Sequence, residues 1–160
     1  MEFDYYIFID YSTNLIGYDI IERKKLKDLL PRISKFAHYR ELKYKRQYVK
    51  SIKKIIKKEK IINFLLKIKI KELRKNLEIY SDILNFIRNH EKCIIFISVD
   101  DHEYNNFKKL VKVVNGEETK IVQESKLKKG TLEYNLSLII DTLLNIERLK
   151  IQGKNVRQSY

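Results

Sequence analysis

Three aspartates stand at the ends of apolar runs that are typical of β-strands. Asp10 ends the run YYIFID at residues 5–10, and Asp100 and Asp101 follow the run CIIFISV at residues 93–99. If the two runs are neighbouring strands of an α/β sheet, their carboxyl ends meet at one edge, where ligands gather. Crowded carboxylates repel one another, and Mg²⁺ or Mn²⁺, which bind oxygen ligands, offset that repulsion. The pattern therefore predicts a metal site built from these three carboxylates.

A site of this kind has a definite chemistry. Two divalent ions roughly 3.5–4 Å apart can activate a water molecule and stabilise the leaving oxygen of a phosphodiester. Each aspartate also has a purely structural interpretation. Asp100 can cap the helix that follows it, with Glu103 three residues on, and Asp10 can form an Asx turn into the next strand. Residue types alone leave both interpretations open.

The hydrophobic pattern predicts the elements that would position these residues. Residues 5–10 and 15–22 form a hairpin around the polar turn 11–14, and 23–48 is irregular or partly helical. Helices are predicted over 49–62, over 72–89 with a buried stripe of Leu73, Leu77, Tyr80, Leu84 and Ile87, between 104 and 114, and from 131 onwards. Residues 93–99 and 119–123 are predicted strands, and 66–71 fits either a strand or an extension of the preceding helix.

Strands that alternate with helices predict an α/β domain with helices packed on both faces of a mixed sheet, which begins with the antiparallel hairpin. The 160 residues suffice for one compact domain. We expect that domain to span 1–151, with a frayed polar tail over 152–160.

The charge of the chain is concentrated in one segment. The whole sequence has a formal charge of +13, and residues 41–80 hold 14 Lys or Arg against 4 Asp or Glu. Such a surplus favours polyanions, so we predict contacts with the phosphates of DNA or RNA. The predicted contact residues are Lys50, Lys53, Lys54, Lys57, Lys58, Lys67, Lys69 and Lys71. A solvated helix face is the alternative, and binding to a membrane surface is disfavoured because the 49–62 helix has few large aromatic anchors.

Other classes of function are disfavoured by what the sequence lacks. The chain has one cysteine, Cys93, and neither of the common glycine-rich phosphate-binding motifs, so a cysteine-based zinc cluster and a nucleotide cofactor are not expected. The first residues do not have the pattern of a signal peptide, and no apolar stretch approaches the length of a membrane span. We expect a cytoplasmic protein that does not enter a membrane.

Several short motifs resemble those of an uncharacterised RNase-H-like family. The segment FIDYSTN at 8–14 is similar to that family's first strand end, Phe-Ile-Asp-Glu-Ser-Gly-Asn, with departures at Tyr11 and Thr13. Residues 38–43 are similar to its Glu-containing segment, and 99–102 to its second strand-end aspartate. The resemblance implies a three-layer RNase-H-like fold and a metal-dependent nuclease, whose acidic residues would be Asp10, Glu41 and Asp100.

The last helix departs from that family, which places an aspartate soon after the helix begins. The candidates here are Glu133, Asn135 and Asp141. Asp141 lies about 140–180° around the helix from the apolar positions 132, 136 and 143, so we expect it to face solvent. That leaves open a second hypothesis, a nucleic-acid-binding protein on the same scaffold without catalysis.

A second resemblance is to the NYN branch of PIN-like nucleases. It is based on the strand end at Asp10 with Asn14, on Glu72 and Glu78, and on the strand end FISVD at 96–100. Asn14 comes one residue late for that motif, and Val99 stands where it has a glycine. Both resemblances imply a site with Asp10 and Asp100, and they differ on whether Glu41 or Glu72 joins it.

Overall fold

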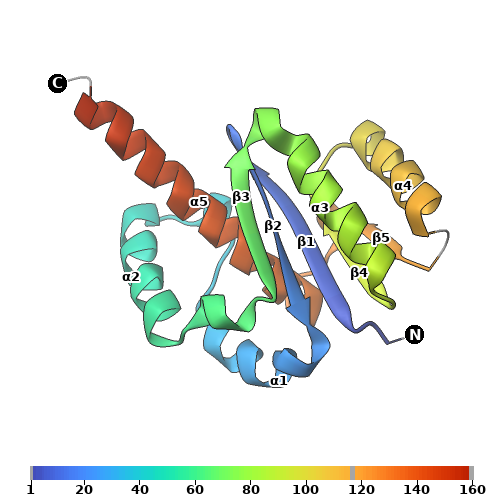
Figure 1. The fold of residues 1–160 in the computed structure, drawn as a ribbon. Coiled ribbons are helices and arrows are strands. Elements are labelled where there is room, and N and C mark those ends of the chain that lie inside the picture. The colour runs from blue at the N-terminus through green and yellow to red at the C-terminus, as the bar shows by residue number, and fades with distance from the viewer. Residues whose placement is uncertain (1, 116–117, 159–160) are drawn as a thin grey trace.

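A five-stranded mixed sheet forms the centre of the molecule (Figure 1). The computed structural model of the chain describes residues 2–115 and 118–158. The strands lie in the order β3-β2-β1-β4-β5, and their bounds are β1 Tyr5–Ser12, β2 Leu15–Glu22, β3 Lys67–Glu72, β4 Cys93–Ile97 and β5 Lys120–Gln123. β2 is antiparallel to both β1 and β3, whereas β1, β4 and β5 run parallel. The carboxyl ends of β1, β4 and β5 therefore share one edge of the sheet.

Helices cover both faces of this sheet (Figure 1). Their bounds are α1 Leu26–Leu29, α2 Lys45–Lys58, α3 Asn76–Asn89, α4 Asp101–Asn115 and α5 Leu132–Gln158. α1, α2 and α5 contribute to the apolar core on one face, and α3 and α4 to the core on the other. The three-layer α/β arrangement predicted from the sequence is therefore confirmed.

The predicted hairpin is confirmed, with a tighter turn than expected. β1 continues to Ser12, and Thr13 and Asn14 connect it to β2. Thr13 has a φ of 53°, the left-handed conformation that two-residue hairpin turns require. The segment at 66–71, for which helix and strand were both open, is the strand β3.

The helix over 72–89 begins later than predicted and buries a different stripe. α3 starts at Asn76 and buries Ile79, Ile83, Phe86 and Ile87 against the sheet. Leu77 was predicted to lie in the buried stripe, but its side chain is 75% exposed. The prediction was wrong because the helix carries two overlapping apolar stripes, and the one with Phe86 and three isoleucines packs on the sheet.

The last helix, α5, crosses the face of the sheet opposite α3 and remains helical as far as Gln158. The division into a domain over 1–151 and a frayed tail over 152–160 stays a prediction. None of the helices in the described residues is long and apolar enough to cross a membrane.

Candidate active site

The register of the three parallel strands aligns three side chains at their carboxyl ends. Phe8 of β1 lies opposite Phe96 of β4, and Phe96 lies opposite Val122 of β5. All three pack into the core on the α5 side of the sheet. Successive side chains of a strand alternate between faces, so the residues two positions further on share that side. They are Asp10, Ser98 and Glu124.

Asp10 is a carboxylate placed where water has little access. Its exposure is 6%, and the backbone N–H of Tyr11 donates a 2.8 Å hydrogen bond to its Oδ1. Burial raises the pKa of Asp10 well above its usual range, and the charges of Glu124 and Asp141 raise it further. The Ser98 hydroxyl and the Tyr11 amide act in the opposite direction. Three carboxyl groups from β1, from the turn after β5 and from α5 thus act on one another.

Glu124 begins the 3-10 helix η6 (Glu124–Lys126), directly after β5. Burial raises its pKa to about 7, and the negative charge of Asp141 contributes to that rise. Hydrogen bonding by the Ser98 hydroxyl lowers the pKa of Glu124 as well as that of Asp10. A hydroxyl has one proton, so it can donate a hydrogen bond to only one of the two carboxylates at a time. The second carboxyl group either carries a proton and donates to Ser98, or is charged and repelled by the first.

Asp141 was expected to face solvent, and this is wrong. Its exposure is 6%. The backbone N–H of Tyr39 donates a 3.0 Å hydrogen bond to Oδ2, and Nε2 of His38 lies 3.9 Å from Oδ1. Burial raises the pKa of Asp141, against the lowering effects of the Tyr39 amide and of the positive charge of Arg40.

The error arose because Asp141 was compared with a single apolar stripe. The middle of α5 is buried nearly all round, and it carries apolar side chains on several sides: Leu136, Leu138, Ile139, Ile140 and Leu144. A polar stripe at steps of four and three runs through this apolar surface, made of Ser137, Asp141, Asn145 and Arg148. That spacing was the available signal for Asp141.

Gly17 of β2 lies opposite Asp10 of β1. Because Gly17 has no side chain, α5 can approach the sheet at this point. A Cβ atom at Gly17 would lie 3.0 Å from Ile70 Cγ1, 3.1 Å from Leu144 Cδ2 and 3.2 Å from the carbonyl oxygen of Lys69. Since Leu144 follows Asp141 by less than one turn, this contact also sets the height of Asp141 above the sheet.

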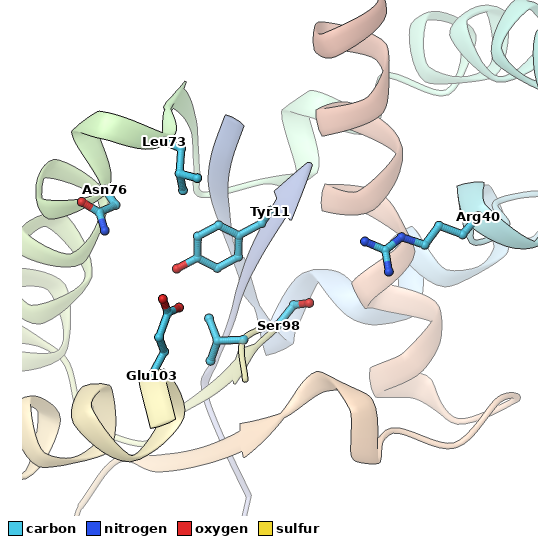
Figure 2. A pocket seen from close by; sticks show the side chains of 7 residues that line it. Tyr11, Arg40, Leu73, Asn76, Ser98 and Glu103 are labelled. Carbon is cyan, nitrogen blue, oxygen red and sulfur yellow. The ribbon is translucent and has the colours of Figure 1, made fainter. Parts of the chain in front are cut away.

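A surface cavity of about 490 Å³ opens beside Ser98 (Figure 2). Tyr11, Arg40, Ser98 and Glu103 are among the residues that line it. Figure 2 shows Arg40 reaching in from one side, with Tyr11 and Glu103 on the other. Ser98 also lines a second hollow that contains His38 and Glu124. A ligand in either cavity would therefore contact residues around Asp10, Glu124 and Asp141, which we call the acidic cluster.

The predicted site residues other than Asp10 have other contacts. Asp100 is exposed, and its Oδ1 accepts a 2.9 Å hydrogen bond from the N–H of Glu103, which is the capping interaction described above. Asp101 accepts a 2.8 Å bond from Gln123 Nε2. Glu41 forms a 2.8 Å ion pair with Lys129. β1 and β4 are neighbours as expected, but the groups that act on the pKa of Asp10 are Glu124 and Asp141.

The donor chemistry of the cluster suits a hard cation, because Asp10, Glu124 and Asp141 offer carboxylate oxygens in a poorly hydrated place. Within residues 2–115 and 118–158, however, no three acidic, histidine or cysteine side chains converge closely enough to enclose a metal ion. The three carboxyl groups interact electrostatically without forming a closed coordination shell.

The predicted nucleic-acid-binding lysines fall into two groups. Lys50, Lys53, Lys54, Lys57 and Lys58 of α2 are exposed, and none of them forms an ion pair within the described part of the chain. On β3, by contrast, Lys69 pairs with Glu78 and Asp82, and Lys71 lies 3.7 Å from Glu78. The ammonium group of Lys67 lies over the ring of Phe86. The charge of α2 is therefore more available to a polyanion than that of β3.

Several solved structures resemble this fold, and two of them are ribonucleases. The ribonuclease H2 from Pyrococcus horikoshii OT3 matches with a TM-score of 0.60 and 13% identity, over 97% of this chain and 77% of that chain. The RNase HII from Archaeoglobus fulgidus, solved in a complex with PCNA, matches with a TM-score of 0.53 and 11% identity, over 96% and 75%. No protein-family model and no curated protein matches the chain.

The chain is thus an α/β domain with an RNase-H-like fold, as the first resemblance implied. The individual motif correspondences and the PIN-like alternative find no support in these two matches. Glu72 and Glu78, which the PIN-like alternative requires, form ion pairs with Arg74 and Lys69.

Proposed function

We propose that this protein is a divalent-metal-dependent nuclease that hydrolyses phosphodiester bonds of DNA or RNA at Asp10, Glu124 and Asp141. The observation that carries the proposal is the burial of Asp10 beside two further carboxyl groups at the carboxyl edge of the parallel strands. The names of the two structural matches, both ribonucleases, support this class of activity.

In this proposal the carboxylates of Asp10, Glu124 and Asp141 would hold Mg²⁺ or Mn²⁺, which would supply an activated water and stabilise the leaving oxygen. Ser98 orients the Asp10 and Glu124 carboxyl groups through its hydroxyl. Glu124 has a pKa of about 7 in the absence of a cation, so it is partly protonated at neutral pH, and binding of the cation would release that proton. The guanidinium of Arg40, which lines the adjoining cavity, would stabilise negative charge on the phosphate.

Asp100, Asp101 and Glu41 remain proposed contributors from the sequence. Each would have to leave its present partner to reach a shared ion. We therefore assign them a secondary role. The cleavage rates of variants at these positions can be compared with those of variants at Asp10, Glu124 and Asp141.

A cleavage assay with Mg²⁺ or Mn²⁺ on single- and double-stranded DNA and RNA tests the proposal. We expect Asp10→Asn, Glu124→Gln and Asp141→Asn each to lower the rate at least about 100-fold. Asp100→Asn and Glu41→Gln should lower it much less, and Glu72→Gln tests the PIN-like alternative in the same assay. If wild type and Asp10→Asn are equally inert on every substrate, the proposed nuclease activity is refuted.

The second candidate is an RNase-H-like protein that binds nucleic acid without cleaving it. The lack of a closed coordination shell among the described residues favours it. This candidate requires binding that weakens steeply with salt and does not depend on a divalent metal.

A further inference from the structure

A smaller hollow of about 170 Å³ lies next to Asp141, between the β1–β2 turn and α5. Three segments that are distant in the sequence build it. Ser12 ends β1 and Thr13 begins the hairpin turn, Tyr39 and Arg40 come from the 3-10 helix η3 (Tyr39–Glu41), and Asp141, Asn145 and Arg148 come from α5. The hollow shares Tyr11 and Arg40 with the larger cavity, so the two are continuous around the acidic cluster.

Arg148 is held in this hollow by neutral partners. Its Nε donates a 3.1 Å hydrogen bond to Ser12 Oγ, and its Nη2 donates a 3.1 Å bond to Asn145 Oδ1. Nη1 donates a 3.3 Å bond to Gln152 Oε1, and the guanidinium lies 5.3 Å from the centre of the Tyr39 ring. These contacts fix the orientation of the side chain while its full positive charge remains.

In the described part of the chain no ion pair joins Arg148 or Arg40 to a carboxylate, and Arg40 acts on Asp141 and Glu124 only from a longer distance, where its charge lowers their pKa values. By contrast, Arg23, Arg32 and Arg74 each form an ion pair with a glutamate. A guanidinium that is already oriented loses little side-chain entropy when it binds an anion, and its planar fork suits phosphate.

The position of the hollow favours a phosphate of a polymer. The ammonium group of Lys45, the first residue of α2, lies 5.6 Å from the centre of the Tyr39 ring, which the Arg148 guanidinium also contacts. Tyr48, one turn further along α2, has its hydroxyl 3.0 Å from Thr142 Oγ1 on α5. The first turn of α2, with the positive charge of Lys45, thus lies next to the hollow.

We propose that Arg148, with Arg40 beside it, binds a backbone phosphate of the nucleic acid next to the bond cleaved at the acidic cluster. The identity of the ligand rests on the proposed function. Arg148 is a positioning residue in this arrangement, because it touches a neighbouring phosphate and not the reacting one.

Binding without metal tests this proposal separately from cleavage. The affinity of a short fluorescent oligonucleotide is measured in EDTA over a series of salt concentrations. We expect Arg148→Gln to weaken binding about tenfold at low salt and to reduce the slope of log K against log salt by about 0.7–0.9, the value for one lost phosphate contact. Arg88→Gln, an exposed residue of α3 outside the site, removes the same charge and should change affinity less than about twofold.

Two further measurements guard against a folding artefact. Ser12→Ala removes the acceptor of Nε but keeps the charge of Arg148, so it should weaken binding with the slope unchanged. A scan of single methylphosphonate substitutions should find one backbone position that matters for the wild type and not for Arg148→Gln, because the neutralised phosphate no longer has a cation to lose.

Equal effects of Arg148→Gln and Arg88→Gln, an unchanged slope, or the absence of salt-dependent binding to any oligonucleotide would overturn the assignment. If wild type and Asp10→Asn are both inert in cleavage, but Arg148→Gln weakens binding as expected, the nuclease proposal is refuted and the phosphate site is retained. The reverse result, cleavage that depends on Asp10 with no Arg148 effect on binding, would refute the phosphate site alone.

Discussion

Asp10 of β1 and Glu124, directly after β5, lie on either side of β4, and hydrogen bonding by the Ser98 hydroxyl beyond the end of β4 lowers the pKa of both. A single hydroxyl cannot donate to both carboxylates at once. The pair therefore favours a retained proton at neutral pH in the absence of a cation. This relationship links the stability of the protein to pH and to metal.

Stability without metal should fall as the pH rises from about 4.5 to about 7. Glu124 has a pKa of about 7 against an ordinary 4.5, and the pKa values of Asp10 and Asp141 are raised in the same direction. Groups with a raised pKa in the folded state bind more protons there, so their stabilising effect is complete below the unfolded pKa and is lost above the folded one. At about 1.4 kcal/mol per pKa unit, Glu124 alone contributes on the order of 3 kcal/mol.

Urea unfolding in EDTA across that pH range measures the effect. Glu124→Gln should flatten the profile, and added Mg²⁺ or Mn²⁺ should restore stability at neutral pH. A flat wild-type profile would contradict the raised pKa values.

Asp19→Val should stabilise the protein by about 1–3 kcal/mol at neutral pH. Asp19 of β2 has no exposed surface, and neither side-chain oxygen accepts a hydrogen bond from another described residue. Burial raises its pKa well above the usual range. Valine suits a central strand and removes the unpaired carboxyl. Urea unfolding measures the change, and Asp19→Asn, which keeps a buried polar group, should give no such gain.

Gly17→Ala should destabilise the fold by about 1–3 kcal/mol, because the added methyl group meets Ile70, Leu144 and a backbone carbonyl within 3.2 Å. The same displacement of α5 should move Asp141 away from Asp10 and lower any cleavage activity. Gly153→Ala is the matched control, since nothing lies within 4 Å of its added methyl group. Within a helix that change should stabilise by about 0.5–1 kcal/mol, so thermal unfolding should separate the two variants by sign.

The two groups of lysines should differ in their effect on nucleic-acid binding. Replacing Lys53 and Lys57 of α2 by glutamine should reduce the salt slope by about 1.5, since both charges are exposed and lack ion pairs among the described residues. Replacing Lys69 and Lys71 of β3 should change it little, because Glu78 already neutralises part of their charge. Fluorescence anisotropy over a salt series distinguishes them, and equal effects would show that both surfaces contact the ligand.

Much of the fold was readable from local patterns. The β1–β2 hairpin, the fully buried β4 and the amphipathic α2 all follow from residues close together in the chain, since alternation and helical periodicity are local properties. The position of Asp10 directly after the apolar residues 7–9 of β1 is local in the same sense, and its place in a functional site stays a proposal. The buried face of α3 was misjudged because two stripes fitted the helical period equally, and packing against the sheet selected one of them.

The partners of Asp10 could not be obtained in this way. Whether Glu124 or Asp100 joins it depends on the register of β5 against β4 and on which side of the sheet each side chain points, both of which are set by pairing between distant segments. The role of Asp141 depends on how closely α5 approaches the sheet at Gly17, and helical periodicity contains no information about that distance. Local sequence thus identified one acid and the basic surface, whereas long-range pairing and packing selected the two acids that act on it.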